Sequence, residues 1–559
     1  MKKLTYVFII LSLCLCALML TSCEKTYDIV YELDGGVNSA DAPTECKESG
    51  TVTLGFPERE NYMFLGWYTE PTFENRIMKI TEADSDITLY AKWIELDKVL
   101  SFKLDKDFYI VNGCNNNVEF IAIPSTYRGL PVTIIGAEAF NACQNVKYVY
   151  MPDSIITVGA VSFWNCTSLE EIRLSENLIN MYTLAFAGCE SLKNIDIPNS
   201  VTTLSSAAFS RTGITSITIP EGITTLDYQM FSDCKYLSEV NLPKNLTTIK
   251  FNAFWGCDSL ETIVIPKSVS TIGEELFIYC DSIKNVEVEE GNEFFKSIDG
   301  VLYSKDGKKL IYYPAGKTDT SYTVSDGAEI IDFGAFRESG HLVSVSIPNT
   351  LKEIRSNAFA DSVIESVILP DSVTEIGFCA FRNCTSLKEL KLSSNLKSID
   401  NLAFENCTSL ESIIIPGSLE YMGLEAFSTC TSLKSVEIQN GVQSIGRLSF
   451  LFCESLESII LPDSITVIEL QAFGECSSLK SIKLSKNLQS IENGAFRRCT
   501  SLESIVIPSS VTNLKIGAFA FCEELVVYCE AENQPDGWAN GWDKQVKEVI
   551  WGYKENDNA

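Results

Sequence analysis

Residues 456–473 read LESIILPDSITVIELQAF, and this stretch contains the pattern that decides the fold. Ile459 and Leu461 are predicted to face inward from a short strand, because successive strand residues point to opposite sides. Pro462 ends the strand, since it has no N–H to donate to a ladder. Apolar residues then recur every three to five positions as far as Phe473. This return path predicts a tight turn or a short helical turn.

The same pattern occurs sixteen times between about residues 121 and 525. Fourteen of the fifteen gaps between its phenylalanines are 22 or 23 residues, and the remaining gap is 59. A fixed period of this size indicates a solenoid. The sixteen phenylalanines are Phe140, Phe163, Phe186, Phe209, Phe231, Phe254, Phe277, Phe336, Phe359, Phe381, Phe404, Phe427, Phe450, Phe473, Phe496 and Phe519.

A single coil cannot fold alone. Its six large apolar side chains contribute at most ~2–3 kcal/mol each, whereas ordering its 23 residues costs about 1.5 kcal/mol per residue. Each coil must therefore cover its neighbours. Strands stacked ~4.8 Å apart would make a rod or arc of roughly 75 Å.

The repeat resembles the BspA-like leucine-rich repeats (the LRR_5 type). The residues that carry this resemblance include CTSLESIIIP at 407–416 and CTSL at 384–387. The resemblance implies an α/β-type repeat solenoid over residues 108–525, with a parallel β-sheet on one face. It also implies extracellular binding or adhesion.

A separate module is predicted at residues 27–95. Its marks are LDGG at 33–36, FLGWY at 64–68 and LYAKW at 89–93. These motifs resemble the internalin-B-type B repeat, also called the Listeria–Bacteroides repeat. The resemblance implies a small β-grasp-like module, and the charged residues 96–107 are interpreted as a connector.

The first residues indicate export. Lys2 and Lys3 precede an apolar run from Leu4 to Leu20, and the sequence Leu-Thr-Ser-Cys ends at Cys23. This resembles a lipoprotein signal: residues 1–22 are expected to be removed, Cys23 to be lipidated, and residues 23–26 to form a linker. An ordinary membrane span is the alternative, since 17 apolar residues lie at its lower limit. The lipoprotein interpretation predicts a bacterial cell-envelope protein, anchored in the membrane through Cys23 and exposed at the cell surface.

Composition argues against several functions. The net charge is −30, whereas proteins that bind nucleic acid need basic patches for the phosphates. There is one histidine, His341, and no motif for a metal, a phosphate or a dinucleotide. We expect no enzyme activity and no cofactor.

Cysteine follows phenylalanine by three residues in thirteen coils, and Thr212, Ser339 and Ser362 take its place in the others. The gaps divide this column into runs of three, three and seven, so pairing between neighbours could never be complete. Small polar replacements also suit a buried site. The column is therefore predicted to consist of free, buried thiols.

Two further columns alternate through the later coils, which makes the sequence unit there 46 residues. One column is charged, and we expect each acid in it to have a base in the coils above and below: Glu365, Lys388, Glu411, Lys434, Glu457, Lys480 and Glu503. The other takes the outward position of each strand, beside a serine-rich column. It is the candidate partner-binding strip on the concave face: Ile368, Lys391, Ile414, Glu437, Ile460, Lys483 and Val506. The alternative is that β-branched residues stand there only for their strand propensity.

Two segments depart from the repeat. Residues 289–327 are predicted to insert a β-hairpin with its turn at 305–308, either as a contact or as a plug between two stacks. Residues 526–559 are predicted to cap the last coil. Trp538 and Trp542 there either seal the core or stack on a glycan.

Together these features predict a surface lipoprotein whose solenoid binds a protein or matrix ligand on host or neighbouring cells. A structural stalk or coat component of the envelope and a glycan-binding surface protein are the alternatives.

Overall fold

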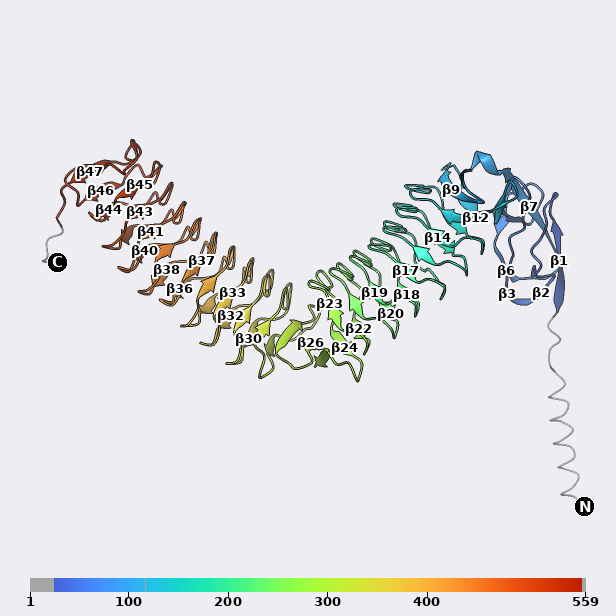
Figure 1. Ribbon diagram of the computed structural model, residues 1–559, viewed down its shortest axis with the longest axis horizontal. Helices are drawn as coiled ribbons and strands as arrows, with labels where there is room; N and C mark the ends of the chain where they lie inside the picture. Colours follow the sequence, from blue (N-terminus) through green and yellow to red (C-terminus); the bar gives the residue numbers. More distant parts are fainter. Residues whose placement is uncertain (1–24, 116, 555–559) are drawn as a thin grey trace, which may run out of the picture. The chain divides into compact units, whose positions relative to one another are not determined.

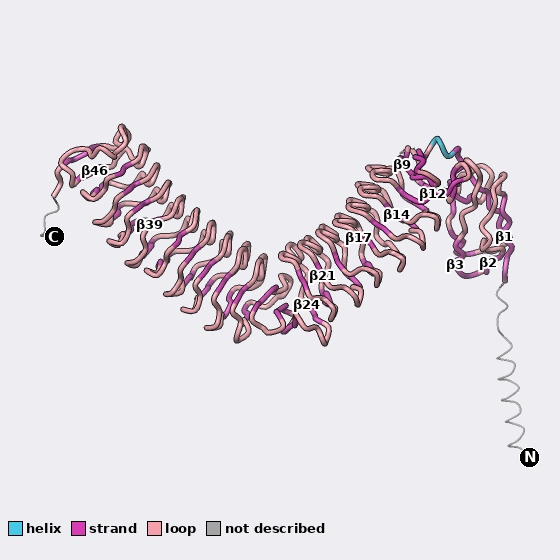
Figure 2. Tube along the Cα trace, in the orientation of Figure 1, coloured by secondary structure: helices cyan, strands magenta, loops and turns pink. Residues whose placement is uncertain are grey.

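The computed structural model describes residues 25–115 and 117–554, and the chain divides into two compact units, residues 1–201 and 202–559. The predicted signal peptide and the predicted lipidation site, Cys23, lie outside the described residues. In both units the chain winds into stacked coils with short strands and long turns (Figures 1 and 2). The described residues contain no α-helix and one 3-10 helix, η1 (Leu96–Lys98).

The first unit begins with a five-stranded sheet in the order β2-β1-β7-β4-β5. The central strands β1 and β7 run parallel, and the outer strands pair antiparallel, as the β-grasp-like prediction requires. A second, two-stranded sheet joins β3 to β6. The strands are β1 (Thr26–Glu32), β2 (Glu45–Lys47), β3 (Ser49–Thr53), β4 (Tyr62–Tyr68), β5 (Arg76–Ile77), β6 (Lys79–Glu82) and β7 (Ile87–Glu95).

The predicted connector at 96–107 is a structured segment. It contains η1 and β8 (Leu100–Asp105), and β8 pairs antiparallel with β9 (Phe108–Cys114). Because β9 then pairs with the first coil, this hairpin covers the end of the stack. The remaining strands of this unit are β10 (Phe120–Ala122), β11 (Thr126–Tyr127), β12 (Leu130–Ile135), β13 (Tyr148–Tyr150), β14 (Thr157–Val158), β15 (Glu171–Arg173) and β16 (Asn180–Met181).

The second unit carries strands on two sides of each coil, rather than one sheet opposite helices. The expected parallel solenoid is confirmed, but the return path forms short strands and turns, so the fold is a β-solenoid. The outer-face strands are β18 (Ser216–Thr218), β20 (Glu239–Asn241), β22 (Thr262–Ile265), β24 (Asn285–Val288), β28 (Ser321–Thr323), β30 (Ser344–Ser346), β32 (Ser366–Ile368), β34 (Glu389–Lys391), β36 (Ser412–Ile415), β38 (Ser435–Ile438), β40 (Ser458–Ile460), β42 (Ser481–Lys483), β44 (Ser504–Ile507), β46 (Val526–Cys529) and β47 (Glu548–Trp551).

The second series has two residues in each strand and also stacks in parallel. Its strands are β17 (Thr203–Leu204), β19 (Thr225–Leu226), β21 (Thr248–Ile249), β23 (Thr271–Ile272), β29 (Ile330–Ile331), β31 (Glu353–Ile354), β33 (Glu375–Ile376), β35 (Ser398–Ile399), β37 (Tyr421–Met422), β39 (Ser444–Ile445), β41 (Val467–Ile468), β43 (Ser490–Ile491) and β45 (Asn513–Leu514).

The phenylalanines line up as the period predicts. The ring of Phe404 lies 5.1 Å from that of Phe381 and 5.0 Å from that of Phe427, and all three are nearly parallel. Each ring is fully buried. The phenylalanine column is therefore the core of the stack.

The turn around each phenylalanine forms a third ladder. In all sixteen coils the residues two before and two after the ring have positive φ, for example Leu402 at 60° and Asn406 at 61°. With this geometry the N–H of Phe404 donates to Ala426 in the next coil at 2.8 Å, and that of Asn406 donates to Ser428 at 2.9 Å. The residues with positive φ thus let the backbone N–H groups of this turn, which is not helical, donate hydrogen bonds to the next coil.

The cysteine column consists of free thiols, as predicted. All seventeen described cysteines are unpaired, and every one that follows a core phenylalanine is buried. From Cys166 onward, each thiol of this column donates to the phenylalanine carbonyl of the preceding coil, as Cys430 does to Phe404 at 3.4 Å. Where threonine replaces cysteine, the Thr212 hydroxyl donates instead to the Phe209 carbonyl of its own coil at 2.8 Å.

The insertion is a plug in the stack. It forms three strands, β25 (Phe295–Ile298), β26 (Val301–Ser304) and β27 (Lys309–Tyr312), and β26 and β27 make the predicted hairpin. Val301, Tyr303 and Leu310 are fully buried, and β27 pairs in parallel with β29 of the next coil. The hairpin therefore replaces one strand of the second series.

Candidate functional site

The residues of the predicted partner-binding strip occupy the outward position of seven successive strands, β32 to β44. The register sets Ile368 opposite Lys391, and it sets Ile414, Glu437, Ile460 and Lys483 in one row. The inward residue beside each of them is buried. Strand alternation therefore produces the row that the sequence predicts.

Three isoleucines of the strip are unusually exposed for large apolar side chains. Ile368 is 56% exposed, Ile414 52% and Ile460 68%. They stand two rungs apart, which is roughly 10 Å along the stack. Val506 is half-buried, and its register partner on β46 is Tyr528. The free apolar surface of the strip thus consists of the three isoleucines.

The charged residues of the strip alternate with the isoleucines and are all exposed. Lys391, Glu437 and Lys483 make no ion pair or side-chain hydrogen bond within the part of the chain that the structure describes. Their pattern is positive, negative, positive. These groups can therefore meet charges of opposite sign on a partner.

A row of serines runs beside the strip on the same outward face. Ser412, Ser435, Ser458 and Ser481 are in register and exposed. Their side chains are short, so the isoleucines project above them. The face is flat, with one raised apolar row.

The neighbouring charged column forms pairs, not the continuous ladder that was predicted. Lys388 binds Glu365 at 3.0 Å, Lys434 binds Glu411 at 3.0 Å, and Lys480 binds Glu457 at 3.3 Å. Each lysine reaches back to the preceding coil, and no bond to the following acid occurs among the described residues. Each pair spans two coils, in keeping with the 46-residue sequence unit.

A second feature supports the two-coil unit. The side chain of Asn487 donates to the Asp463 carbonyl at 2.9 Å, and the Lys486 N–H donates to the Asp463 carboxylate at 3.3 Å. The same arrangement joins Asn395 and Ser394 to the coil before them. Alternate coils are therefore locked together in pairs.

The earlier coils present a different outward face. On β13 the ring of Tyr150 stacks on Phe56 of the N-terminal module, with centroids 3.9 Å apart, and the Arg173 guanidinium lies 4.8 Å from the centroid of the Tyr150 ring. Burial raises the pKa of Tyr150. Farther along, Thr218 and Asn241 are polar and Val264 is 42% exposed. No continuous apolar row forms on the described strands there.

Docking of the module on the first coil creates a groove that the sequence did not predict. It has a volume of about 360 Å³ and is lined by Phe56, Arg59, Tyr62, Tyr127 and Tyr150, among others. Arg59 lies over the Tyr62 ring at 4.1 Å and bonds to Asp34 at 3.0 Å. The aromatic Tyr150 in a column of polar residues was the one available signal.

The two tryptophans proposed for glycan stacking are core residues. Trp538 is 4% exposed and Trp542 2%, and the Trp542 ring meets Phe519 edge-on at 6.1 Å. The Trp538 indole donates to the Val511 carbonyl at 3.0 Å. Neither ring offers a face to a sugar, because both seal the last coil.

The described residues do not gather into a metal-binding cluster. No group of three or more histidine, cysteine or acidic side chains could hold a metal ion within residues 25–115 and 117–554. His341 lies exposed in a turn. In the same ranges, no helix combines the length and the hydropathy that a membrane span requires.

Comparison with known proteins agrees with this architecture. The model for the BspA type leucine rich repeat region matches residues 109–238, 206–303, 312–430 and 397–526, and the model for the Listeria-Bacteroides repeat domain matches 27–92. A search of curated proteins found no match.

Two of the solved structures that match this chain come from bacteria. A leucine rich cell surface protein from Faecalibacterium prausnitzii is 30% identical, with 69% of this chain and 93% of that chain covered and a TM-score of 0.51. A leucine-rich repeat protein from Bacteroides ovatus is 24% identical, with 77% and 98% covered and a TM-score of 0.46. The family models and the first of these structures lead to one conclusion: this chain belongs to the BspA type leucine rich repeat family.

Proposed function

We propose that this protein is a lipid-anchored surface protein whose partner-binding strip holds a protein ligand of a host or neighbouring cell. The observation that carries the proposal is the exposure of Ile368, Ile414 and Ile460, each more than half exposed at the same outward strand position, with Ile414 and Ile460 in one register-aligned row. Exposed apolar side chains in a row are a feature of interaction surfaces. Solenoid proteins use such extended faces for binding.

The charges of the strip make a protein partner a better fit than a passive structural role. Lys391 and Glu437 stand between the isoleucines and Lys483 follows the last of them. None of the three has an ion-pair partner among the described residues. A stalk needs no such pattern, whereas complementary charges set the register of a bound chain. The ligand is expected to carry an acid, a base and an acid, roughly 10 Å apart.

Anchoring rests on the sequence of the first 23 residues. Lys2 and Lys3, the apolar run and the Leu-Thr-Ser-Cys ending at Cys23 fit a lipoprotein signal. Two or more acyl chains hold a protein firmly at a membrane. A fatty-acid label should enter the wild-type protein but not the Cys23→Ser variant.

The strip is tested by charge insertion. Cells displaying the full-length protein are assayed for binding to host matrix proteins and to host cells, and the same assay is run on Ile414→Glu with Ile460→Glu. We expect at least a tenfold loss of affinity, because a carboxylate would be buried against the partner.

The matched control is Ile516→Glu, since Ile516 is 56% exposed but lies outside the strip. It should bind as the wild type does, and all variants should keep the wild-type unfolding midpoint. Equal binding by the strip variant and the wild type would refute the proposal and favour the stalk. Loss in the control as well would show that the charge acts nonspecifically.

A further inference from the structure

The hydrogen-bond ladder of the second strand series is interrupted beside the insertion. In a regular coil the Thr247 carbonyl accepts the N–H groups of Ser270 and Thr271, and the Ile249 carbonyl accepts that of Gly273 at 2.7 Å. The corresponding carbonyls one coil later belong to Ser270 and Ile272. Neither accepts a hydrogen bond from any described residue, because β27 pairs with β29 and leaves the edge of β23 open.

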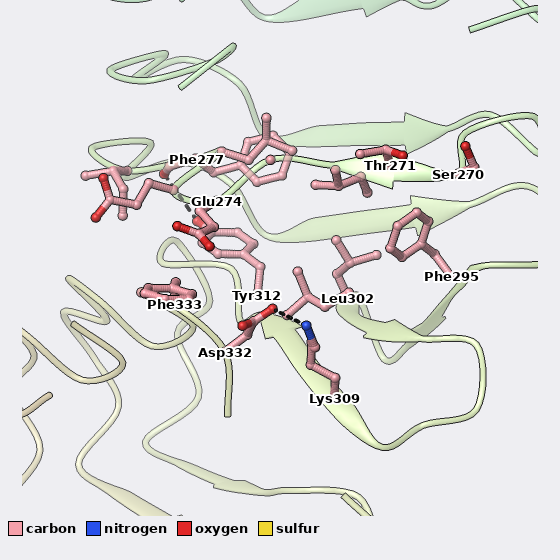
Figure 3. Close-up of a pocket in the computed structure, with 17 residues that line it drawn as sticks. Ser270, Thr271, Glu274, Phe277, Phe295, Leu302, Lys309, Tyr312, Asp332 and Phe333 are labelled. Carbon is pink, nitrogen blue, oxygen red and sulfur yellow. Dashed lines mark hydrogen bonds and ion pairs between the residues drawn. The ribbon is translucent and has the colours of Figure 1, made fainter. Parts of the chain in front are cut away.

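The open edge faces a pocket of about 250 Å³. Its floor and walls are apolar: Phe295, Leu302 and Tyr312 come from the three strands of the insertion, and Phe333 comes from the next coil (Figure 3). Ile272 lines the pocket and is only half-buried, whereas Ile249 before it is fully buried. The insertion thus holds the neighbouring coil away from β23 and leaves a space between them.

At the open edge of β23 the backbone groups that have no partner among the described residues are acceptors, the carbonyls of Ser270 and Ile272. Lys309 binds Asp332 at 3.2 Å, and Asp332 also binds Arg355 at 3.0 Å, so that carboxylate is already neutralised. The Tyr312 hydroxyl donates to the Phe277 carbonyl and accepts from the Ala315 N–H.

Glu274 lines the pocket beside Tyr312 and makes no hydrogen bond or ion pair with the described residues (Figure 3). The acceptors left over are therefore the Glu274 carboxylate and the carbonyls of Ser270 and Ile272. A ligand that suits them must bring hydrogen-bond donors and, to match Glu274, a positive charge.

The size of the space limits the ligand further. An apolar cavity of about 150 Å³ holds benzene, so this pocket has room for one aromatic ring and a short chain. Burial of the ring among Phe295, Leu302 and Tyr312 would supply the hydrophobic contribution.

We propose that this pocket binds a small aromatic primary amine of the arylethylamine class. The ring lies against Phe295, Leu302, Tyr312 and Phe333, and the ammonium group donates to the Glu274 carboxylate and to the open carbonyls of β23. This site is independent of the partner-binding strip, which lies on the other strand series.

The probe is phenylethylamine, titrated into the purified full-length protein by calorimetry, with 2-phenylethanol as its uncharged analogue. We expect a Kd between roughly 10 μM and 1 mM for the amine, as befits so small a ligand. The alcohol should bind at least tenfold more weakly, because it has no charge to place beside Glu274.

Glu274→Gln should weaken the amine at least tenfold and leave the alcohol unchanged. Glu287→Gln is the control, since it removes one exposed acid of the same unit away from the pocket. Circular dichroism and the unfolding midpoint should match the wild type for both variants. Three results would overturn the proposal. The amine does not bind at a concentration tenfold above the upper expected Kd, the alcohol binds as tightly as the amine, or the Glu274→Gln variant binds the amine as tightly as the wild type does.

Discussion

Ile376 and Ile272 occupy the same position in two coils of one unit, five residues before the core phenylalanine, yet their surroundings differ. Ile376 is buried, and its carbonyl accepts the Asp400 N–H at 2.9 Å. Ile272 is half-buried, and its carbonyl accepts no hydrogen bond from the described residues. In the regular coil the next coil donates hydrogen bonds to the carbonyls at the strand edge. At the insertion the corresponding carbonyls of β23 accept no hydrogen bond from the described residues.

This difference separates two kinds of surface. The regular stack can offer only its faces, so any binding there must be periodic, as in the partner-binding strip. The insertion interrupts the period and creates one singular pocket. A repeat protein can therefore carry a repeated surface and a unique site without changing its core.

The largest expected effect tests the regular core against the interruption. In Phe404→Ala, loss of a ring held between two others at 5.1 and 5.0 Å should lower the free energy of unfolding by about 3–5 kcal/mol. Phe333→Ala removes the same side chain beside the pocket, where it is half-buried. Its loss should be under about 1.5 kcal/mol.

Urea unfolding followed by circular dichroism measures both values. Equal losses in the two variants would mean that the insertion packs as tightly as a regular coil, which would contradict the open edge. A loss in Phe404→Ala below about 1 kcal/mol would contradict the stacked core.

Much of the regular stack could be predicted from the sequence, since Phe404 and Cys430 belong to columns whose spacing alone sets their neighbours. The strip residue Ile414 followed from the same alternation. The period of the sequence does not determine the sign of the backbone φ angle. The positive φ at Leu402 and the absence of a helix in the described coils were therefore not predicted.

The singular features were harder to predict. The role of β8 depends on its pairing with β9, and the pocket depends on which strand β27 chooses as its partner. Both contacts join segments that occur once in the chain, so no repeated spacing predicts which strands pair. Glu274 resembled any other exposed acid until the open edge beside it was seen.

A second prediction concerns pH and the cysteine column, which is unbroken from Cys384 to Cys522. Burial raises the pKa of the Cys430 thiol from 9.0 to about 12, and that of Cys476 to about 12 as well. The folded state therefore prefers the protonated thiol. Its contribution to stability is complete below pH 9 and is lost as the pH rises toward 12, by about 3 kcal/mol per thiol near pH 11.

The urea midpoint measured between pH 8 and 11 tests this prediction. The variant Cys430→Ser with Cys476→Ser should show a flatter decline than the wild type, because it has two fewer buried thiols to ionise. Tyr303 of the insertion also has a pKa raised by burial, from 10.0, so the interval between pH 9 and 10 isolates the thiols best. A decline of equal slope in both proteins would assign the alkaline loss to the tyrosines.

The smallest effect compares two ion pairs. Lys434 and Glu411 lie in the regular coils, 57% and 64% exposed, whereas Arg355 and Asp332 lie beside the insertion, 28% and 13% exposed. Lys434→Ala should lower the free energy of unfolding by less than about 0.5 kcal/mol, and this loss should vanish in 1 M salt. Arg355→Ala should cost about 1–2 kcal/mol and keep most of that loss in salt, because Asp332 is largely buried and would retain only Lys309. If the two losses were equal and equally sensitive to salt, water would screen Asp332 as fully as Glu411. Asp332 would then count as a second free acid at the pocket beside Glu274, not as a carboxylate neutralised by Lys309 and Arg355.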